Sequence, residues 1–247
     1  MISYVIFDFD GTLADSKDVF ISVFNQLATK KGYRQIESEN LQFLRGLTIA
    51  ARCRYLSVPM YQIPFLAAEF LALYKKELPQ VKLFNGIREL LAGLHAIGCK
   101  TAIISSNDER NIAGFLSSNK VDSVTEIYCK ASLFGKDKLI AKFLKKYNLR
   151  PNQVLYVGDE TRDIIACQRA GVKIAWVEWG YDIRETACAA NPDYLVSRPG
   201  EILTIVKQVW IDLLWSYCMV SKEPVFSQKT DFWYCTAYKI LDDPAYL

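Results

Sequence analysis

Two aspartates separated by one residue stand at the end of the first apolar run of the chain. The run Tyr4–Phe7 continues directly into the DFDGT segment, residues 8–12. The alternation of side chains along a strand puts Asp8 and Asp10 on the same side, and Gly11 allows the backbone to turn away. Two carboxylates this close repel each other unless a cation or a shared proton compensates them. The segment therefore predicts a site that holds a divalent metal or moves a proton.

Short apolar runs recur along the chain, and polar residues follow them. They predict strands at Tyr4–Phe7, Thr101–Ile104, Val154–Val157 and Lys173–Val177, with a further short strand near Glu126–Cys129. The stretches between them predict helices at Gly86–Ile97, Lys138–Tyr147 and Asp163–Ala170. Strands that alternate with helices indicate a parallel sheet covered on both faces, and such sheets bind ligands at the carboxyl ends of their strands.

The region from Ser16 to about Phe84 differs, because it carries almost no strand pattern. It predicts helices at Lys17–Lys31, Glu39–Arg45, Ile49–Leu56 and Ile63–Glu77, with hinges near Ala14–Ser16 and Leu83–Gly86. The fold class that we expect is α/β, a Rossmann-like parallel sheet core with an inserted helical cap domain. The core would comprise residues 1–15 and 84–208, the cap residues 16–83, and a C-terminal helix and aromatic tail of unknown role residues 209–247. We expect the tail to pack against the core, with a self-association surface as the alternative.

Two further segments carry groups that could bind phosphate. An apolar strand ends in Ser105, Ser106 and Asn107, whose polar groups and backbone N–H groups can bind phosphate oxygens, although these residues are also ordinary in turns. Lys136 follows a glycine before a predicted helix and would act as a point cation beside such oxygens. Lys138 lies two residues on and is its rival for this role.

A second buried strand also ends in a carboxylate. Val154–Val157 is followed by Gly158 and Asp159, and another acid, Asp163, comes four residues later. Acids at this place can simply cap the following helix. Their position at a strand end nevertheless matches that of the first aspartate pair.

These four segments resemble the motifs of the haloacid dehalogenase-like hydrolase superfamily, in the order in which that family has them. DFDGT matches the DxDGT pattern in full, Ser105 stands where a Ser or Thr closes a strand, and GDETRD matches GDxxxD. Lys136 stands at the family lysine, although Asp137 replaces the proline that often follows it. The resemblance covers about residues 4–205. The helical insert resembles the small cap of the phosphoglycolate phosphatase-like branch.

The resemblance implies a role for each candidate residue. Asp8 would be the nucleophile that forms an aspartyl-phosphate, and Asp10 would protonate the leaving oxygen and then activate water. Mg²⁺ would bind Asp8, Asp159 and the backbone carbonyl of Asp10. Asp10 also favours phosphoryl transfer, because the dehalogenase branch lacks this second aspartate. Lys136 would neutralise charge on the phosphoryl group. The residues that would contact the phosphoryl oxygens are Ser105, Ser106, Asn107 and Lys136. Asp163, Gly11 and Thr12 would support these residues.

We therefore expect a Mg²⁺-dependent phosphatase that acts on a small phosphorylated metabolite such as phosphoglycolate. Arg45 in the helical insert is a candidate for binding a substrate carboxylate or a second phosphate, and a surface arginine is the alternative. A sugar-phosphate mutase of the same family and a non-catalytic binding protein on the same fold stay open as alternative functions.

Composition limits the remaining classes. The formal net charge of the 247 residues is only +3, which argues against a nucleic-acid or membrane-surface partner. The seven cysteines are odd in number and form no CxxC pair, so we expect reduced thiols. The longest apolar stretch, Ile202–Val220, contains Lys207 and Asp212 and predicts a buried helix. No signal peptide is evident, so we expect a cytoplasmic location. We also expect a monomer or a homodimer.

Overall fold

The computed structural model describes residues 1–129 and 135–221, with side chains up to residue 210. The aromatic tail from residue 222 onward therefore lies outside the described residues, and so does the predicted packing of that tail. Contacts divide the chain into two units, Met1–Val206 and Lys207–Leu247. The fold and the site described below belong to the first unit.

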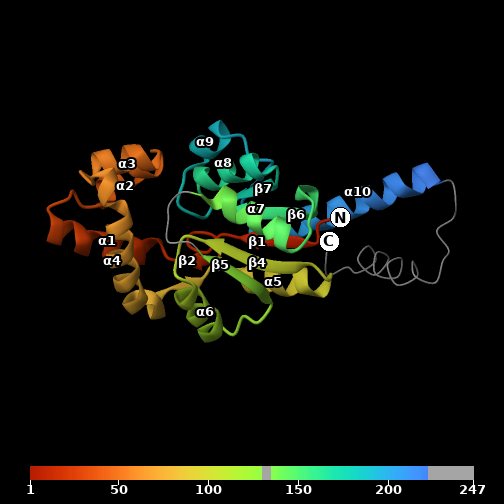
Figure 1. Cartoon of the computed structure of the whole chain (residues 1–247), viewed down its shortest axis with the longest axis horizontal. Helices are drawn as coiled ribbons and strands as arrows, with labels where there is room; N and C mark the ends of the chain where they lie inside the picture. Colours follow the sequence, from red (N-terminus) through yellow and green to blue (C-terminus); the bar gives the residue numbers. More distant parts are fainter. Residues whose placement is uncertain (130–134, 222–247) are drawn as a thin grey trace. The chain divides into compact units, whose positions relative to one another are not determined.

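A six-stranded parallel sheet forms the centre of this unit, and it confirms the predicted α/β class (Figure 1). Its strand order is β5-β4-β1-β6-β7-β8, and each neighbouring pair is parallel. The strands are β1 (Tyr4–Phe7), β4 (Lys100–Ser105), β5 (Val124–Cys129), β6 (Val154–Gly158), β7 (Lys173–Val177) and β8 (Tyr194–Val196). β4 and β5 lie on one side of β1, and β6, β7 and β8 lie on the other, so the strand order reverses at β1. Ligands bind to such sheets at the point of reversal.

Helices cover both faces of the sheet because successive strand residues point to opposite sides. Tyr4 and Ile6 pack with Phe143 and Ile164 in one buried cluster. On that side of the sheet lie α7 (Lys136–Lys146), α8 (Thr161–Ala170) and α9 (Arg184–Ala189) (Figure 1). The other side carries α5 (Ile87–Ala96) and α6 (Glu109–Ser118).

The register of the central strands brings their carboxyl ends level. Phe7 of β1 pairs with Ile103 of β4 and with Val157 of β6. Asp8, the residue after β1, is therefore level with Ile104 of β4 and with Gly158, the last residue of β6. Ser105 and Asp159 each lie two residues beyond those paired positions, so the sheet itself gathers the predicted site residues at one edge.

The segment between β2 (Ala14–Asp15) and β3 (Lys82–Leu83) is helical, as the sequence predicts. It contains α1 (Lys17–Lys31), α2 (Ser38–Arg45), α3 (Ile49–Tyr55), α4 (Ile63–Glu77) and the short 3₁₀ helices Met60–Gln62 and Leu78–Gln80. We call residues 17–80 the helical insert. It has a small hydrophobic core of its own, whose buried members are Ile36, Leu44, Leu56 and Val58. The antiparallel pairing of β2 with β3 holds the two ends of the insert together.

The structure adds elements that the sequence analysis did not predict. The two-residue strands β2 and β3 lie at the predicted hinges, and they are too short to show a period. β8, α6 and α9 are also new, although Asp108, whose side chain accepts from the N–H of Arg110 at 2.9 Å, is a recognisable N-cap for α6. The last helix, α10, spans Pro199–Ser221 and so crosses the predicted boundary between residues 208 and 209.

No single helix within the described residues is long and apolar enough to cross a membrane. The segments Ile49–Tyr55 and Met60–Gln80 meet the criteria of length and composition only when joined, and they are bent by 106° at the break between them.

The aromatic cluster around Phe143 of α7 predicts a large loss of stability when that side chain is truncated. Phe143 is fully buried, and its ring centroid lies 5.2 Å from Tyr4, 5.5 Å from Tyr128 and 4.8 Å from Tyr147. We expect Phe143→Ala to lower the free energy of unfolding by about 3–5 kcal/mol, measured by denaturant titration. The matched control is Ile165→Ala on α8, where the side chain is 40% exposed and the expected loss is below about 1 kcal/mol. Equal losses in the two variants would contradict this account of the core.

Candidate active site

A buried lysine joins two aspartates at the carboxyl edge of the sheet. Nζ of Lys136 forms ion pairs with Oδ2 of Asp8 and, at 2.5 Å, with Oδ1 of Asp163. Burial alone lowers the pKa of Lys136, but the charges of Asp163 and Asp8 outweigh it and the pKa is raised. The other oxygen of Asp8 accepts a hydrogen bond from the N–H of Phe9 at 2.7 Å. The lysine is therefore a fixed cation beside Asp8, whereas its rival Lys138 is exposed.

A third carboxylate, that of Asp159, completes the cluster. Single oxygens of Asp8, Asp159 and Asp163 all lie within 4.8 Å of one another, and all three residues are buried. Asp159 accepts hydrogen bonds from the hydroxyl of Thr12 at 2.8 Å and from the N–H of Tyr181 at 2.7 Å. Burial first, and then the neighbouring acidic charges, raise the pKa of Asp159 well above its usual range. Among the described residues no basic side chain forms an ion pair with it.

The donor set of this cluster fits a hard divalent cation. Three carboxylates face a single lysine, so the cluster carries negative charge that a cation would compensate. All the donors are oxygens, which Mg²⁺ and Ca²⁺ prefer. The backbone also closes tightly around Asp159, because a Cβ at Gly11 or at Gly180 would collide with its side chain. Gly11 has a φ of +77°, a conformation that suits glycine.

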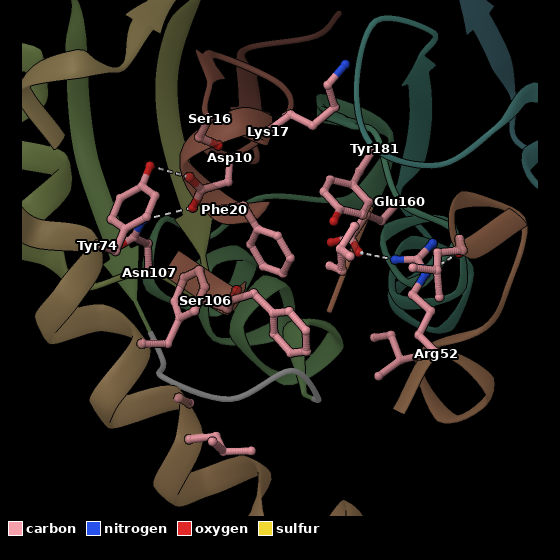
Figure 2. Close-up of a pocket in the computed structure, with 18 of the residues that line it drawn as sticks. Asp10, Ser16, Lys17, Phe20, Arg52, Tyr74, Ser106, Asn107, Glu160 and Tyr181 are labelled. Atoms are coloured by element: carbon pink, nitrogen blue, oxygen red, sulfur yellow. Dashed lines mark hydrogen bonds and ion pairs between the residues drawn. The ribbon is translucent and has the colours of Figure 1, made fainter. Parts of the chain in front are cut away.

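The carboxylate of Asp10 makes different contacts from that of Asp8. Its Oδ1 accepts from the hydroxyl of Tyr74 at 2.7 Å, and its Oδ2 accepts from Nδ2 of Asn107 at 2.8 Å (Figure 2). The alternation expected of a strand does not extend to Asp10, because β1 ends at Phe7. Burial raises the pKa of Asp10, and the hydrogen bonds from Tyr74 and Asn107 act in the opposite direction. The structure thus separates the two aspartates of the DFDGT segment into two environments.

The polar residues that follow β4 lie beside Asp10. Ser105 is buried, and its Oγ accepts from the N–H of Asn107 at 3.1 Å. Ser106 and Asn107 line a pocket that also includes Asp10. This pocket, of about 270 Å³, extends from the sheet edge into the helical insert (Figure 2). An acid, an amide and hydroxyls therefore stand at one end of a cavity whose remaining walls come largely from the insert.

Comparison with known proteins matches this architecture. The family model described as "Haloacid dehalogenase-like hydrolase" matches residues 5–177. The chain belongs to the haloacid dehalogenase-like hydrolase family. A phosphoglycolate phosphatase of Synechococcus elongatus is 31% identical over 206 residues, which are 83% of this chain and 97% of that protein. An N-acetylmuramic acid 6-phosphate phosphatase of Pseudomonas aeruginosa is 25% identical, over 84% of this chain and 96% of that protein.

Solved structures of the haloacid dehalogenase-like family share the fold. A family hydrolase from Streptococcus pneumoniae superposes with a TM-score of 0.71 at 22% identity, and the match covers 83% of this chain and 98% of that one. The predicted family, the predicted phosphoglycolate phosphatase-like branch and the predicted enzyme class, a phosphatase, are thereby confirmed.

Two arginines of the insert contact the core of this haloacid dehalogenase-like hydrolase. Arg45 donates from Nε to the carbonyl of Tyr181 at 2.7 Å and from Nη2 to that of Gly180 at 3.1 Å. Arg52, which the sequence analysis did not select, forms ion pairs with Asp182 and, at 3.6 Å, with Glu160. Arg52 lines the pocket, and Arg45 is not among its lining residues.

The sequence analysis also missed Tyr74, the residue from α4 whose hydroxyl reaches Asp10. The only sequence signal was a tyrosine within an otherwise apolar helix, whose hydroxyl needs a partner when it is buried. Tyr74 is 1% exposed.

Removing the hydroxyl of Tyr74 tests the coupling between insert and core. We expect Tyr74→Phe to lower kcat on an aryl phosphate about 10- to 100-fold, because a hydrogen bond to a charged group is worth about 1.5–3 kcal/mol. KM should change little, since the ring stays in place. Steady-state kinetics provide the measurement, and Tyr61→Phe, on the same insert and 75% exposed, is the matched control. Wild-type kcat in Tyr74→Phe would show that this hydrogen bond does not position Asp10.

Proposed function

We propose that this hydrolase cleaves small-molecule phosphomonoesters in a Mg²⁺-dependent reaction through an aspartyl-phosphate at Asp8. The observation that carries the proposal is the environment of Asp8, whose carboxylate is paired with buried Lys136 and grouped with two further buried carboxylates. A carboxylate nucleophile is effective when nearby positive charge lets it approach an anionic phosphoryl group.

Asp8 and Asp10 divide the chemistry between them. A carboxylate oxygen of Asp8 attacks phosphorus, and the bond between phosphorus and the leaving oxygen breaks. Asp10 gives its proton to that oxygen, and then takes a proton from the water that cleaves the aspartyl-phosphate. Asp10 is half-buried, and burial raises its pKa. A raised pKa suits a carboxyl group that must carry a proton for part of the reaction cycle.

The remaining site residues would bind the metal ion and the phosphoryl group and neutralise their charges. Asp8, Asp159 and the backbone carbonyl of Asp10 would hold Mg²⁺, which when bound supplies positive charge beside the phosphoryl oxygens. Asp163 fixes Lys136, Thr12 orients Asp159, and Gly11 leaves room for the Asp159 carboxylate. The phosphoryl oxygens would be contacted by Ser105, Ser106, Asn107 and Lys136.

The helical insert would act as a cap over this site. Its arginines and Tyr74 reach the sheet edge, and a cap closed over the reacting groups would exclude water and select the leaving group. In this proposal residues 16–83 form the cap, and residues 1–15 and 84–208 form the core. A substrate contact of Arg45 stays a prediction, because its guanidinium binds the carbonyls of Gly180 and Tyr181.

Likeness to relatives suggests that the substrate is a small phosphorylated metabolite, and it makes phosphoglycolate the first candidate. The relative at 31% identity carries that name, and a second relative is named for N-acetylmuramic acid 6-phosphate. The comparisons do not favour a sugar-phosphate mutase or a non-catalytic binding protein. The cytoplasmic location and the monomeric or homodimeric state stay predictions.

Removal of the proposed nucleophile should abolish turnover. We expect Asp8→Asn to lower phosphate release from an aryl phosphate by at least about 1,000-fold, because an amide cannot form the aspartyl-phosphate. Asp18→Asn, at an exposed acid on α1, is the matched control and should keep wild-type activity. Circular dichroism establishes that both variants are folded. Turnover in folded Asp8→Asn would rule out the proposed nucleophile.

Removal of the metal should abolish turnover reversibly. We expect EDTA to abolish phosphate release and added Mg²⁺ to restore it. Asp159→Asn should raise the Mg²⁺ dissociation constant by at least about tenfold, measured by calorimetry, because it removes a buried anionic ligand. The exposed acid Asp122 provides the control variant, Asp122→Asn. Full activity in EDTA would exclude the metal assignment.

A further inference from the structure

The pocket beside Asp10 changes character with distance from the sheet. Its polar end is formed by Asp10, Ser16, Ser106 and Asn107. Beyond them, most lining residues are aliphatic or aromatic side chains of the insert, among them Phe20, Phe24, Leu66, Phe70 and Leu71. Protein interiors hold few voids larger than a water molecule, and an apolar void is filled most favourably by apolar groups. A cavity of about 270 Å³ with this lining is therefore suited to an apolar ligand group.

Four rings form a continuous aromatic wall that begins at the proposed acid. Tyr74, which donates to Asp10, stacks on Phe70 with 6.0 Å between ring centroids. Phe70 packs on Phe20 at 5.0 Å, and Phe20 meets Tyr181 edge-to-face at 5.2 Å. Three of these rings come from the insert and one from the core, and all four line the pocket. A leaving group protonated by Asp10 would lie against this wall.

Two of the three cations that line the pocket are already paired with acids. Among the described lining residues the cations are Lys17, Arg52 and Arg162. Arg52 is paired with Asp182 and Glu160. Arg162 is paired with Glu160 through Nη2, and its Nη1 is buried without a hydrogen-bond partner in the part of the chain that the structure describes. Lys17 extends away from Asp10 (Figure 2). A carboxylate on a leaving group that lies against the four rings would therefore be desolvated by apolar side chains, which is costly.

We infer that the preferred substrates are phosphomonoesters of an uncharged, apolar alcohol or phenol. This inference rests on the proposed phosphomonoesterase function and specifies the leaving group. The phosphoryl group would bind at Asp8 and Lys136, which are not among the lining residues of the pocket, and the organic group would extend past Asp10 into its apolar part. The pocket lining therefore disfavours phosphoglycolate, the candidate that likeness to a relative suggests, because its leaving group carries a carboxylate.

A homologous series of esters tests the inference on the wild-type protein. We expect kcat/KM to rise about fourfold for each methylene from methyl to hexyl phosphate, as each one becomes buried. Phosphoglycolate should be at least about tenfold poorer than propyl phosphate, an uncharged ester of similar length. Asp8→Asn should remove activity on every member of the series.

Variants of α4 connect the selectivity to the aromatic wall. We expect Phe70→Ser to reduce the ratio of kcat/KM for hexyl phosphate to that for methyl phosphate by at least about tenfold, because the wall loses its central ring. Phe65→Ser on the same helix, where the side chain is 72% exposed and lies outside the pocket lining, should leave the ratio unchanged. The ratio compares two substrates of one preparation, so partial unfolding does not alter it.

The outcomes separate the two levels of the argument. A flat series, a preference for phosphoglycolate over propyl phosphate, or an unchanged ratio in Phe70→Ser would overturn the apolar leaving group while leaving the phosphatase intact, provided that Asp8→Asn is inactive. Absence of Asp8-dependent hydrolysis of every ester would overturn the proposed function itself, and this inference with it.

Discussion

The crowding of buried carboxylates at one edge of the sheet is the constraint on which this structure depends. Lys136 lies between Asp8 and Asp163, and these three residues come from α7, from the end of β1 and from α8. Removing one partner of a buried ion pair typically costs about 3–5 kcal/mol, because the remaining charge is left without compensation. The three elements must therefore meet in one arrangement. Since Lys136 does not pair with Asp159, the cluster keeps a negative charge for a cation to neutralise.

The position of β1 explains how the helical insert reaches this cluster. The chain leaves β1 after Phe7 and passes through the DFDGT segment, and β2 and β3 then pair at the base of the insert. The insert therefore starts and ends beside Asp10, so a side chain from its last long helix can reach that carboxylate. Tyr74 does so from 64 positions along the chain. The same short connection places Arg52 against Asp182 on the opposite side of the pocket.

Sequence predicted the part of the site that follows from strand ends. Asp8, Ser105 and Asp159 each come after a buried apolar run, and parallel strands bring their carboxyl ends to one edge. The contacts of Tyr74 and Arg52 were not predictable, because they depend on how the insert packs on the core. The sequence around each residue gives no indication of that packing. The short strands β2, β3 and β8 lacked enough residues to show a period. The environment of Asp10 was missed for a related reason, since strand alternation stops at Phe7.

The sheet edge and the apolar part of the pocket are built by different parts of the chain, and in the proposed function this separates the reacting groups from those that select the leaving group. Strand register and buried charge hold Asp8, Lys136 and Asp159 at the sheet edge. The apolar end is formed largely by side chains of the insert, whose packing requires hydrophobic residues of suitable size and no particular chemistry. Relatives named for different phosphate esters are compatible with such a division. In this chain the insert supplies three of the four rings of the aromatic wall, and Arg52 is paired with core acids, so a leaving group as we propose it would lie against rings.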